Sequence, residues 1–246
     1  QPISRYDFCL DTICTVSIYD SGDERLLDEC FELIDRYERL FSATVSGSDI
    51  YKLNHSGGEK VEVDPETAYL ISEALRYSRL TDGAFDITIY PVSLLWDFKS
   101  GKAVLPDDEE LNEALRHVGY ENIVLEDNTV HLVDAGAQLE LGALAKGYIE
   151  DKVCELLRDR GVSSALVNLG GNVAAVGKLP DGSKFRVGIK QPFSETGEVS
   201  EVIEAEDAAV ATSGIDERYF EYVIICYSLL LFDVRQMYDK LKVIFL

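Results

Sequence analysis

The most constraining feature of this chain is the stretch Leu139–Gly147, where an apolar run changes into a helical pattern. It predicts a short strand carrying an acid at Glu140, then the small pair Gly142–Ala143, and then a helix that opens around Lys146. Small side chains at such a turn let a ligand approach main-chain N–H groups at a helix N-terminus, where phosphate is commonly held. A second small-residue turn, Gly170–Gly171, follows another apolar run. Together the two turns predict a nucleotide or metal–phosphate site.

Length and charge limit the partners of the chain. Its 246 residues fit one large domain or two small ones and are enough to bury a core. The formal net charge of −22 argues against nucleic acid and anionic membrane surfaces as partners. It leaves open a nucleotide held by backbone N–H groups, one lysine and a divalent cation. The five cysteines are scattered and form no Cys-x-x-Cys pair, so we expect neither a disulfide framework nor a zinc site.

The hydrophobic spacing predicts an α+β fold with mixed or antiparallel sheets and packed helices. Asp64 followed by Pro65 is a strong helix start, and Gly161 is a typical helix end. The expected segments are a strand at 11–19, helices at 23–41, 65–80 and 108–117, a hairpin at 122–133, a helix at 145–160, and strands at 163–169, 184–190 and 199–212, the last with an interruption.

Several short motifs follow one another in a specific order. They are Asp11-Thr12, Phe41-Ser42, Ser48–Asn54, Gly83–Thr88 leading to Pro91 and Leu95-Trp96, Glu140–Gly147, Val167–Gly171 and Ala209–Gly214. In this order the chain resembles the ApbE family of FAD-dependent FMN transferases, also called flavin trafficking proteins. The resemblance implies an ApbE-like, T-fold-related architecture over residues 1–220, with an atypical tail at 221–246.

The resemblance also implies a chemistry. Family members bind FAD and Mg²⁺ and move FMN onto a threonine or serine hydroxyl of an acceptor protein, and some instead hydrolyse FAD to FMN and AMP. A metal is physically reasonable because attack at an anionic phosphorus requires charge neutralisation. The family further implies a bacterial, extracytoplasmic, periplasmic or membrane-anchored protein. Contact with a membrane is expected only through an N-terminal lipid anchor, which this chain does not carry.

Residue by residue, the resemblance assigns FAD contacts to Leu10, Thr44, Ala84, Phe85, Asp86, Glu140, Lys146, Gly171 and Ser213, and a metal-binding main-chain carbonyl to Ala143. It assigns no catalytic residue. The residues themselves leave plainer interpretations open. Phe85 fits a core aromatic, Asp86 fits a cap on the following turn, and Gly170–Gly171 fits close strand packing. The three histidines are interpreted as surface or loop residues without a catalytic role.

The tail departs from the family pattern. Family members continue with a His-x-Ile-x-Asp-Pro-x-Thr-Gly-like segment, and a later Asp and Ser/Thr complete the metal site. Here no histidine, proline or glycine follows Gly214, and Asp233 and Asp239 do not match the family positions. A frameshift or premature stop is favoured over a true variant tail. Weak Mg²⁺ binding and poor or absent FMN transfer are therefore expected. The alternatives are a flavin-binding or inactive remnant and, less favoured, an interaction domain without a ligand.

Overall fold

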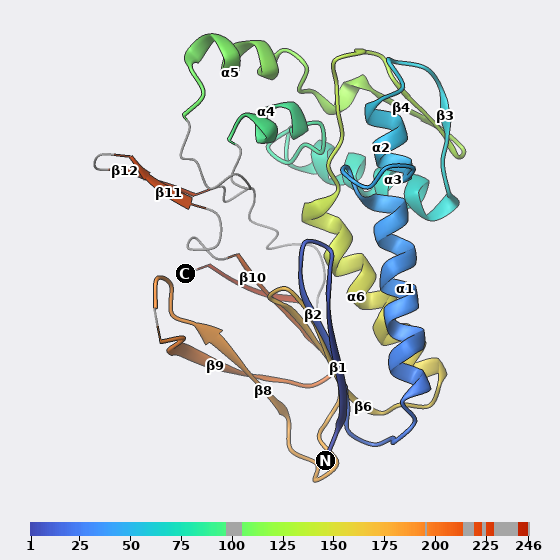
Figure 1. Cartoon of the computed structure of the whole chain (residues 1–246), viewed down its shortest axis with the longest axis vertical. Helices are drawn as coiled ribbons and strands as arrows, with labels where there is room; N and C mark the ends of the chain where they lie inside the picture. The colour runs from blue at the N-terminus through green and yellow to red at the C-terminus, as the bar shows by residue number, and fades with distance from the viewer. Residues whose placement is uncertain (97–104, 195, 214–218, 223–224, 229–240, 246) are drawn as a thin grey trace. The chain divides into compact units, whose positions relative to one another are not determined.

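A computed structural model describes residues 1–96, 105–194, 196–213, 219–222, 225–228 and 241–245 (Figure 1). The chain divides into two compact units. We call the first the sheet unit, which comprises residues 1–37, 146–218 and 228–246. The second is the helical unit, which comprises residues 38–145 and 219–227. Each unit is described by itself.

The sheet unit is built on a six-stranded sheet. Its order is β1 (Ile3–Cys9), β2 (Thr12–Ile18), β6 (Ser164–Leu169), β7 (Asn172–Gly177), β10 (Ala209–Ser213) and β13 (Leu241–Phe245). Neighbouring strands run antiparallel, except that β10 and β13 are parallel. The two-residue connection between β1 and β2 and the turn between β6 and β7 therefore project from ends of this sheet as hairpins.

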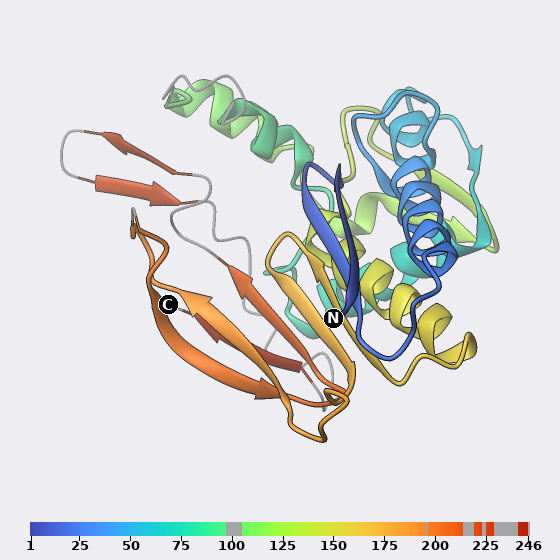
Figure 2. The same cartoon turned by 60° about the horizontal axis from the view of Figure 1, so that its bottom comes forward.

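Both faces of the central strands are covered within the sheet unit. The parts of α1 (Arg25–Phe41) and α6 (Gly142–Asp159) that belong to it lie side by side on one face (Figures 1 and 2). The antiparallel pair β8 (Phe185–Lys190) and β9 (Val199–Ala205) lies on the other. Alternate side chains of β8 are buried and join a core cluster with Ala175 and Val210. Apolar burial between these layers holds the sheet in place.

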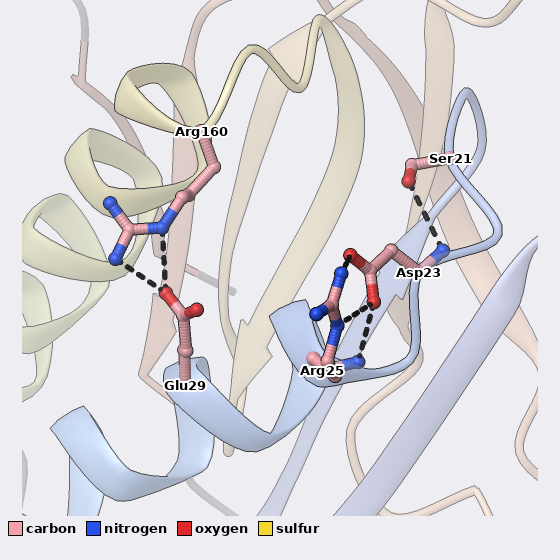
Figure 3. Close-up of polar contacts among 5 residues, drawn as sticks. All are labelled: Ser21, Asp23, Arg25, Glu29 and Arg160. Atoms are coloured by element: carbon pink, nitrogen blue, oxygen red, sulfur yellow. Dashed lines mark hydrogen bonds and ion pairs between the residues drawn. The ribbon is translucent and has the colours of Figure 1, made fainter.

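Polar side chains fix the ends of the two helices (Figure 3). Asp23 accepts from the backbone N–H of Arg25 at 3.1 Å and also takes two hydrogen bonds from its guanidinium. Arg160 donates to Glu29 at 2.8 Å, which ties the chain just after α6 to α1. Gly161, with φ +80°, then ends α6 in the left-handed region that glycine tolerates.

The helical unit combines short helices with a small sheet. Its elements are α2 (Asp49–Asn54), β3 (Val61–Glu62), α3 (Pro65–Leu80), α4 (Tyr90–Leu95), α5 (Asp108–Leu115), the 3-10 turn η2 (Tyr120–Asn122), β4 (Ile123–Glu126) and β5 (Thr129–Leu132), with strand order β3-β5-β4. It also contains β11 (Tyr219–Tyr222) and all but the last residue of its partner β12 (Ile225–Ser228). Asp49 is 5% exposed and accepts from the Asp64 N–H and the Thr67 hydroxyl, which fixes the start of α3 against α2. Asp64 itself caps α3 through the Glu66 N–H.

The α+β class is confirmed, and so are most of the expected segments. The helix expected at 145–160 begins three residues earlier, at Gly142, because Leu141 already accepts from Leu144 and Ala145. Strands β1 and β7 were not expected. The expectations for the tail, including those for Asp233 and Asp239, fall largely outside the described residues, and the boundary between residues 220 and 221 stays a prediction. Within the described residues, no helix has the length and apolarity needed to cross a bilayer.

A carboxyl group is buried where α6 packs in the sheet unit. Glu150 is 2% exposed, and one of its carboxyl oxygens has no hydrogen-bond partner. Burial, and then the nearby charge of Asp151, raises its pKa from 4.5 to about 9, while the Ala174 N–H opposes the shift. Removal of this carboxyl from water disfavours its charged form, so the folded protein holds Glu150 protonated at neutral pH.

We predict that Glu150 makes the fold less stable as pH rises. The unfolded chain loses this proton near pH 4.5 and the folded chain near pH 9, so the free energy of unfolding should fall between these values. Glu150→Gln should remove that slope and raise stability at pH 8 by on the order of 2 kcal/mol. Urea unfolding followed by circular dichroism across this pH range is the measurement. Glu155→Gln, an exposed site on the same helix, is the control. An unchanged slope in Glu150→Gln would contradict the prediction.

Candidate functional site

The segment before α6 is held by the side chain of Asn54, at the end of α2. The Asn54 Oδ1 accepts from the Leu139 N–H at 2.6 Å, and its Nδ2 donates to the Leu139 carbonyl at 2.9 Å. The Gln138 side chain donates back to the Asn54 carbonyl at 3.3 Å. One side-chain amide thus satisfies both backbone groups of a fully buried residue 85 positions away.

The strand predicted over Leu139–Leu141 is wrong, because Asn54 replaces the neighbour that a strand would need. The segment is extended, with one isolated parallel bridge between Gln138 and Ile89. The Glu140 N–H donates to the Ile87 carbonyl at 2.8 Å, which brings Glu140 beside the segment that contains Ala84–Asp86. Within the helical unit, a backbone contact therefore joins two segments with predicted FAD residues, the one that contains Glu140 and the one that contains Ala84–Asp86.

The start of α6 is open to solvent. Gly142 and Ala143 are exposed, whereas Leu144 and Ala145 are buried. A Cβ added at Gly142 would lie 3.2 Å from the Glu140 carboxylate, so that acid lies close to the first turn. Lys146 is the fifth residue of α6 and not its opening residue, so its positive charge lies beyond the first turn, where a cation would oppose the helix dipole. The small residues leave the backbone of this turn accessible.

Asp86 organises a second group of contacts within the helical unit. Its Oδ1 accepts from both the N–H and the hydroxyl of Thr88, at 2.8 and 2.6 Å. Its Oδ2 accepts from the Tyr120 N–H at 2.7 Å, while the Thr88 hydroxyl oxygen accepts from the Gly119 N–H at 2.8 Å. Asp86 therefore caps the turn that follows it, as its plainer interpretation expected. It also anchors the start of η2, which was not expected.

The neighbours of Asp86 differ in exposure. Phe85 is buried and packs edge-on against Tyr77, with ring centroids 6.5 Å apart, so its side chain belongs to the core. Ala84 is exposed. Thr44 is also exposed, and both its backbone N–H and its hydroxyl lie within 3.2 Å of the Ser42 hydroxyl. Nothing in these contacts tests a role in FAD binding, so these assignments stay predictions.

The remaining predicted residues gather at one end of the six-stranded sheet. The Asn168 side chain accepts from the Gly171 N–H at 3.1 Å, and the Gly171 carbonyl accepts from the N–H and hydroxyl of Thr212. Gly171 therefore lies beside Thr212, the residue before Ser213, at this end of β10. Leu10 lies in the turn between β1 and β2 at the same end. The sheet thus places Leu10, Gly171 and Ser213 at the same end.

Gly170 shows that close packing contributes to this turn. A Cβ at Gly170 would fall 2.4 Å from the Thr12 side chain, at the start of β2. Its φ of +63° is also a conformation that side-chain-bearing residues rarely adopt. The interpretation of this glycine as a packing residue is therefore supported by geometry.

The three histidines of the helical unit are exposed or half-buried. His55 is exposed and stacks on Tyr51, and His117 approaches Asp134 at 2.8 Å. Hydrogen bonding from the Gly136 N–H, and then from His117, lowers the pKa of Asp134. His131 is half-buried in β5, with its Nδ1 buried and without a hydrogen-bond partner, so it is a strand residue and not a loop residue.

Two surface hollows lie away from the predicted FAD residues. One of about 560 Å³ in the helical unit is lined by Leu95, Asp107, Glu109, Glu110, Glu113, Ala114 and His117. Another of about 420 Å³ in the sheet unit is lined by Pro2, Ile3, Ser4, Arg5, Glu24, Leu27 and Asp28. Neither contains a predicted FAD residue. Among the described residues, no group of three or more His, Cys, Asp or Glu side chains has the arrangement of a metal site.

The model of the ApbE family matches residues 10–235. The chain belongs to the ApbE family. It is 33% identical to a protein of Treponema pallidum named FAD:protein FMN transferase, with 89% of this chain and 66% of that protein covered. A Klebsiella pneumoniae protein of the same name is 35% identical over 82% of this chain and 63% of its own length. The chain thus spans somewhat less than two thirds of these curated relatives.

Solved structures support the fold. The ApbE protein of Thermotoga maritima superposes with a TM-score of 0.83 at 32% identity, covering 93% of this chain and 75% of that one. The flavin transferase ApbE of Vibrio cholerae gives a TM-score of 0.76 at 27% identity, covering 85% and 70%. The architecture expected from the motif order is therefore confirmed.

Sequence reasoning missed the residues that hold the candidate site in shape. Asn54, Thr88 and Tyr120 were given no role, although each contacts a segment with a predicted FAD residue. Asn54 lies within the Ser48–Asn54 motif, which is the only sequence signal that pointed to it. Their partners lie 2 to 85 residues away along the chain.

We predict that Asn54→Ala destabilises the fold. The substitution leaves the buried Leu139 N–H and carbonyl without partners, which should cost about 2–4 kcal/mol. Urea unfolding followed by circular dichroism is the measurement. Asn112→Ala is the matched control, because Asn112 makes an exposed local hydrogen bond on α5. Equal losses in the two variants would contradict the role given to Asn54.

Proposed function

We propose that this chain transfers FMN from FAD to a serine or threonine hydroxyl of an acceptor protein. The observation that carries the proposal is family membership combined with the relatives named FAD:protein FMN transferase. In the reaction, the acceptor oxygen forms a bond to the phosphorus of the FMN half. The pyrophosphate P–O bond to the AMP half breaks, the hydroxyl proton is lost, and AMP leaves. If water takes the place of the hydroxyl, the products are FMN and AMP, as in an FAD pyrophosphatase.

The candidate residues suit the binding of an anionic dinucleotide. The exposed backbone at Gly142–Ala143 and the Gly170–Gly171 turn give close access to main-chain groups. Lys146 supplies a positive charge one helical turn from Gly142, suited to a pyrophosphate oxygen. The remaining contacts assigned by the resemblance are Leu10, Thr44, Ala84, Phe85, Asp86, Glu140 and Ser213. The role of this chain's residues is to bind and orient FAD.

Mg²⁺ belongs to the proposal only if the described residues can supply its oxygen ligands. Ala143 is an exposed residue at the start of α6, and its main-chain carbonyl would offer one oxygen. The described residues supply no carboxylate cluster around it, whereas Mg²⁺ takes about six oxygen ligands. The fit is therefore poor, and we assign the ion no step in this chain. Weak Mg²⁺ binding remains the expectation.

An extracytoplasmic location is also proposed, on the family resemblance alone.

A flavin-binding chain with little transfer is the second candidate. The sequence after Gly214 favours it, since the segment lacks the histidine, proline and glycine of the family pattern. Both candidates require FAD binding, and only the first requires covalent flavin on an acceptor. Transfer therefore separates them, and FAD binding separates both from an interaction domain without a ligand.

We predict that Lys146→Ala weakens FAD binding about tenfold, because a charge-assisted contact to the pyrophosphate is lost. Isothermal titration calorimetry is the measurement. Lys152→Ala is the control, since Lys152 lies on the same helix and pairs with Glu155 at 2.8 Å. Unchanged affinity in Lys146→Ala would remove this lysine from the site.

Transfer itself is the test of the proposed function. The full chain is mixed with FAD, Mg²⁺ and an acceptor peptide with a Ser/Gly-Ala-Thr type site, and covalent flavin fluorescence on the peptide is followed. We predict FAD-dependent labelling that disappears when the acceptor threonine is replaced by valine. FAD binding without any labelling would support the second candidate and contradict the first. Absence of FAD binding would contradict both.

A further inference from the structure

β1 forms an open edge of the six-stranded sheet. It pairs with β2 on one side, and the part of the chain that the structure describes places no strand on its other side (Figure 1). An open strand edge presents backbone N–H and carbonyl groups that can pair with another chain. The edge spans the seven residues of β1, so it is longer than the short edges that proteins commonly use to avoid such pairing.

The hairpin geometry shows which backbone groups face outward. Leu10 and Asp11 have φ values of 54° and 58°, as in a two-residue type I′ turn, and Cys9 is paired with Thr12. Such a turn closes on a hydrogen-bonded pair, and hydrogen-bonded pairs then alternate along the strands. The N–H and carbonyl groups of Ser4, Tyr6 and Phe8 therefore point to the open edge.

The same edge carries an exposed apolar face. Tyr6 is 76% exposed, Phe8 67% and Ile13 55%. Tyr6 and Phe8 are two residues apart on β1, and Phe8 lies opposite Ile13 on β2, so all three share one face. Single exposed apolar residues are common, but three large ones in one contiguous patch indicate an interaction surface.

The other face of β1 carries opposite charges at matching positions. Arg5 and Asp7 flank Tyr6 on that face, and their side chains are 39% and 54% exposed. Arg5 also reaches Asp28 on α1 at 2.8 Å. A strand with a cation and an anion placed symmetrically about its central residue is complementary to a second copy of itself in the antiparallel direction.

We propose that β1 pairs antiparallel with β1 of a second copy of this chain, about a twofold axis at Tyr6. This register places Arg5 opposite the second copy's Asp7, and Tyr6 opposite its counterpart. All seven residues of β1 are then paired. Because Tyr6 faces outward, the two tyrosines exchange both backbone hydrogen bonds, as a hydrogen-bonded antiparallel pair requires.

The alternative registers are poorer. A twofold axis at Asp7 places two aspartates opposite each other, and one at Arg5 places two arginines opposite each other. Like charges directly opposite each other destabilise strand pairing. Axes at Ser4 or Phe8 leave fewer residues of β1 paired and lose the Arg5–Asp7 match. The sequence of β1 therefore selects the Tyr6 register.

Pairing exchanges two contacts of Asp7, which in the isolated chain also forms an ion pair with Arg5 at 3.2 Å. In the isolated chain the Phe8 N–H donates to its neighbour Asp7 at 2.9 Å, which covers part of the edge. In the pair, Phe8 donates instead to the carbonyl of the second copy's Ser4, and Asp7 turns to the second copy's Arg5.

The net charge of −22 opposes association, and an interface of one strand edge is small. The dimer should therefore be weak, with a micromolar dissociation constant that falls as salt screens the net repulsion.

Charge reversal tests the register. Sedimentation velocity on the full chain at increasing concentration should show a reversible monomer–dimer equilibrium. Arg5→Asp alone and Asp7→Arg alone should each weaken it at least tenfold, and the double variant Arg5→Asp/Asp7→Arg should restore it. Val202→Lys is the control, since Val202 is an exposed apolar residue on β9, away from this edge. A chain that stays monomeric, or a dimer unaffected by the single reversals, overturns the proposal.

Cross-linking gives an independent test. Tyr6→Cys places two thiols directly opposite each other, about 5.5 Å apart at Cα, within the range a disulfide requires. Mild oxidation should therefore give a covalent dimer on a non-reducing gel. Phe8→Cys, opposite Ser4 of the second copy, should cross-link at least tenfold less. Equal cross-linking of the two variants, or none from Tyr6→Cys, overturns the register. An edge that binds only a different protein also overturns the proposal.

Discussion

The candidate site depends on one side chain, Asn54, pairing with the backbone of Leu139. A buried N–H and carbonyl must be satisfied, and Leu139 has no neighbouring strand within the described residues to do so. The amide of Asn54 presents a donor and an acceptor in the same arrangement as a peptide group, and it uses both. This pairing fixes the segment that leads into α6, and with it Glu140 and the open turn that follows. Asp86 extends the same principle to the start of η2, where its carboxylate accepts from the backbone N–H of Tyr120.

Local patterns predicted much of the fold, because the features they report are local. The helix at Pro65 begins where Asp64 can cap it, and Gly161 ends α6 because it tolerates a positive φ. The strand expected at Leu139–Leu141 failed for a nonlocal reason, since its backbone partner is a side chain far away in sequence. β1 was missed because its side chains follow no clear apolar alternation, and its exposed aromatic residues do not report a buried face.

The roles of the candidate residues were also only partly predictable from local sequence patterns. Motif order identified the family, and the structure places Leu10, Gly171 and Ser213 at one end of the six-stranded sheet. Phe85 and Gly170 have clear packing roles, which the sequence left open beside their ligand roles. The side chains that support the site could not be ranked from sequence, because an Asn or Thr that caps its own turn looks the same as one that holds a distant segment.

The contact between Gly170 and Thr12 restricts how this family member can change over time. Two separate barriers oppose any side chain at position 170, since it would overlap Thr12 and would also adopt a disfavoured backbone conformation. Shortening residue 12 relieves only the first barrier, so no single compensating change frees the glycine. The turn between β6 and β7 is therefore expected to drift more slowly in sequence than the exposed strand β9, where side chains have room to vary.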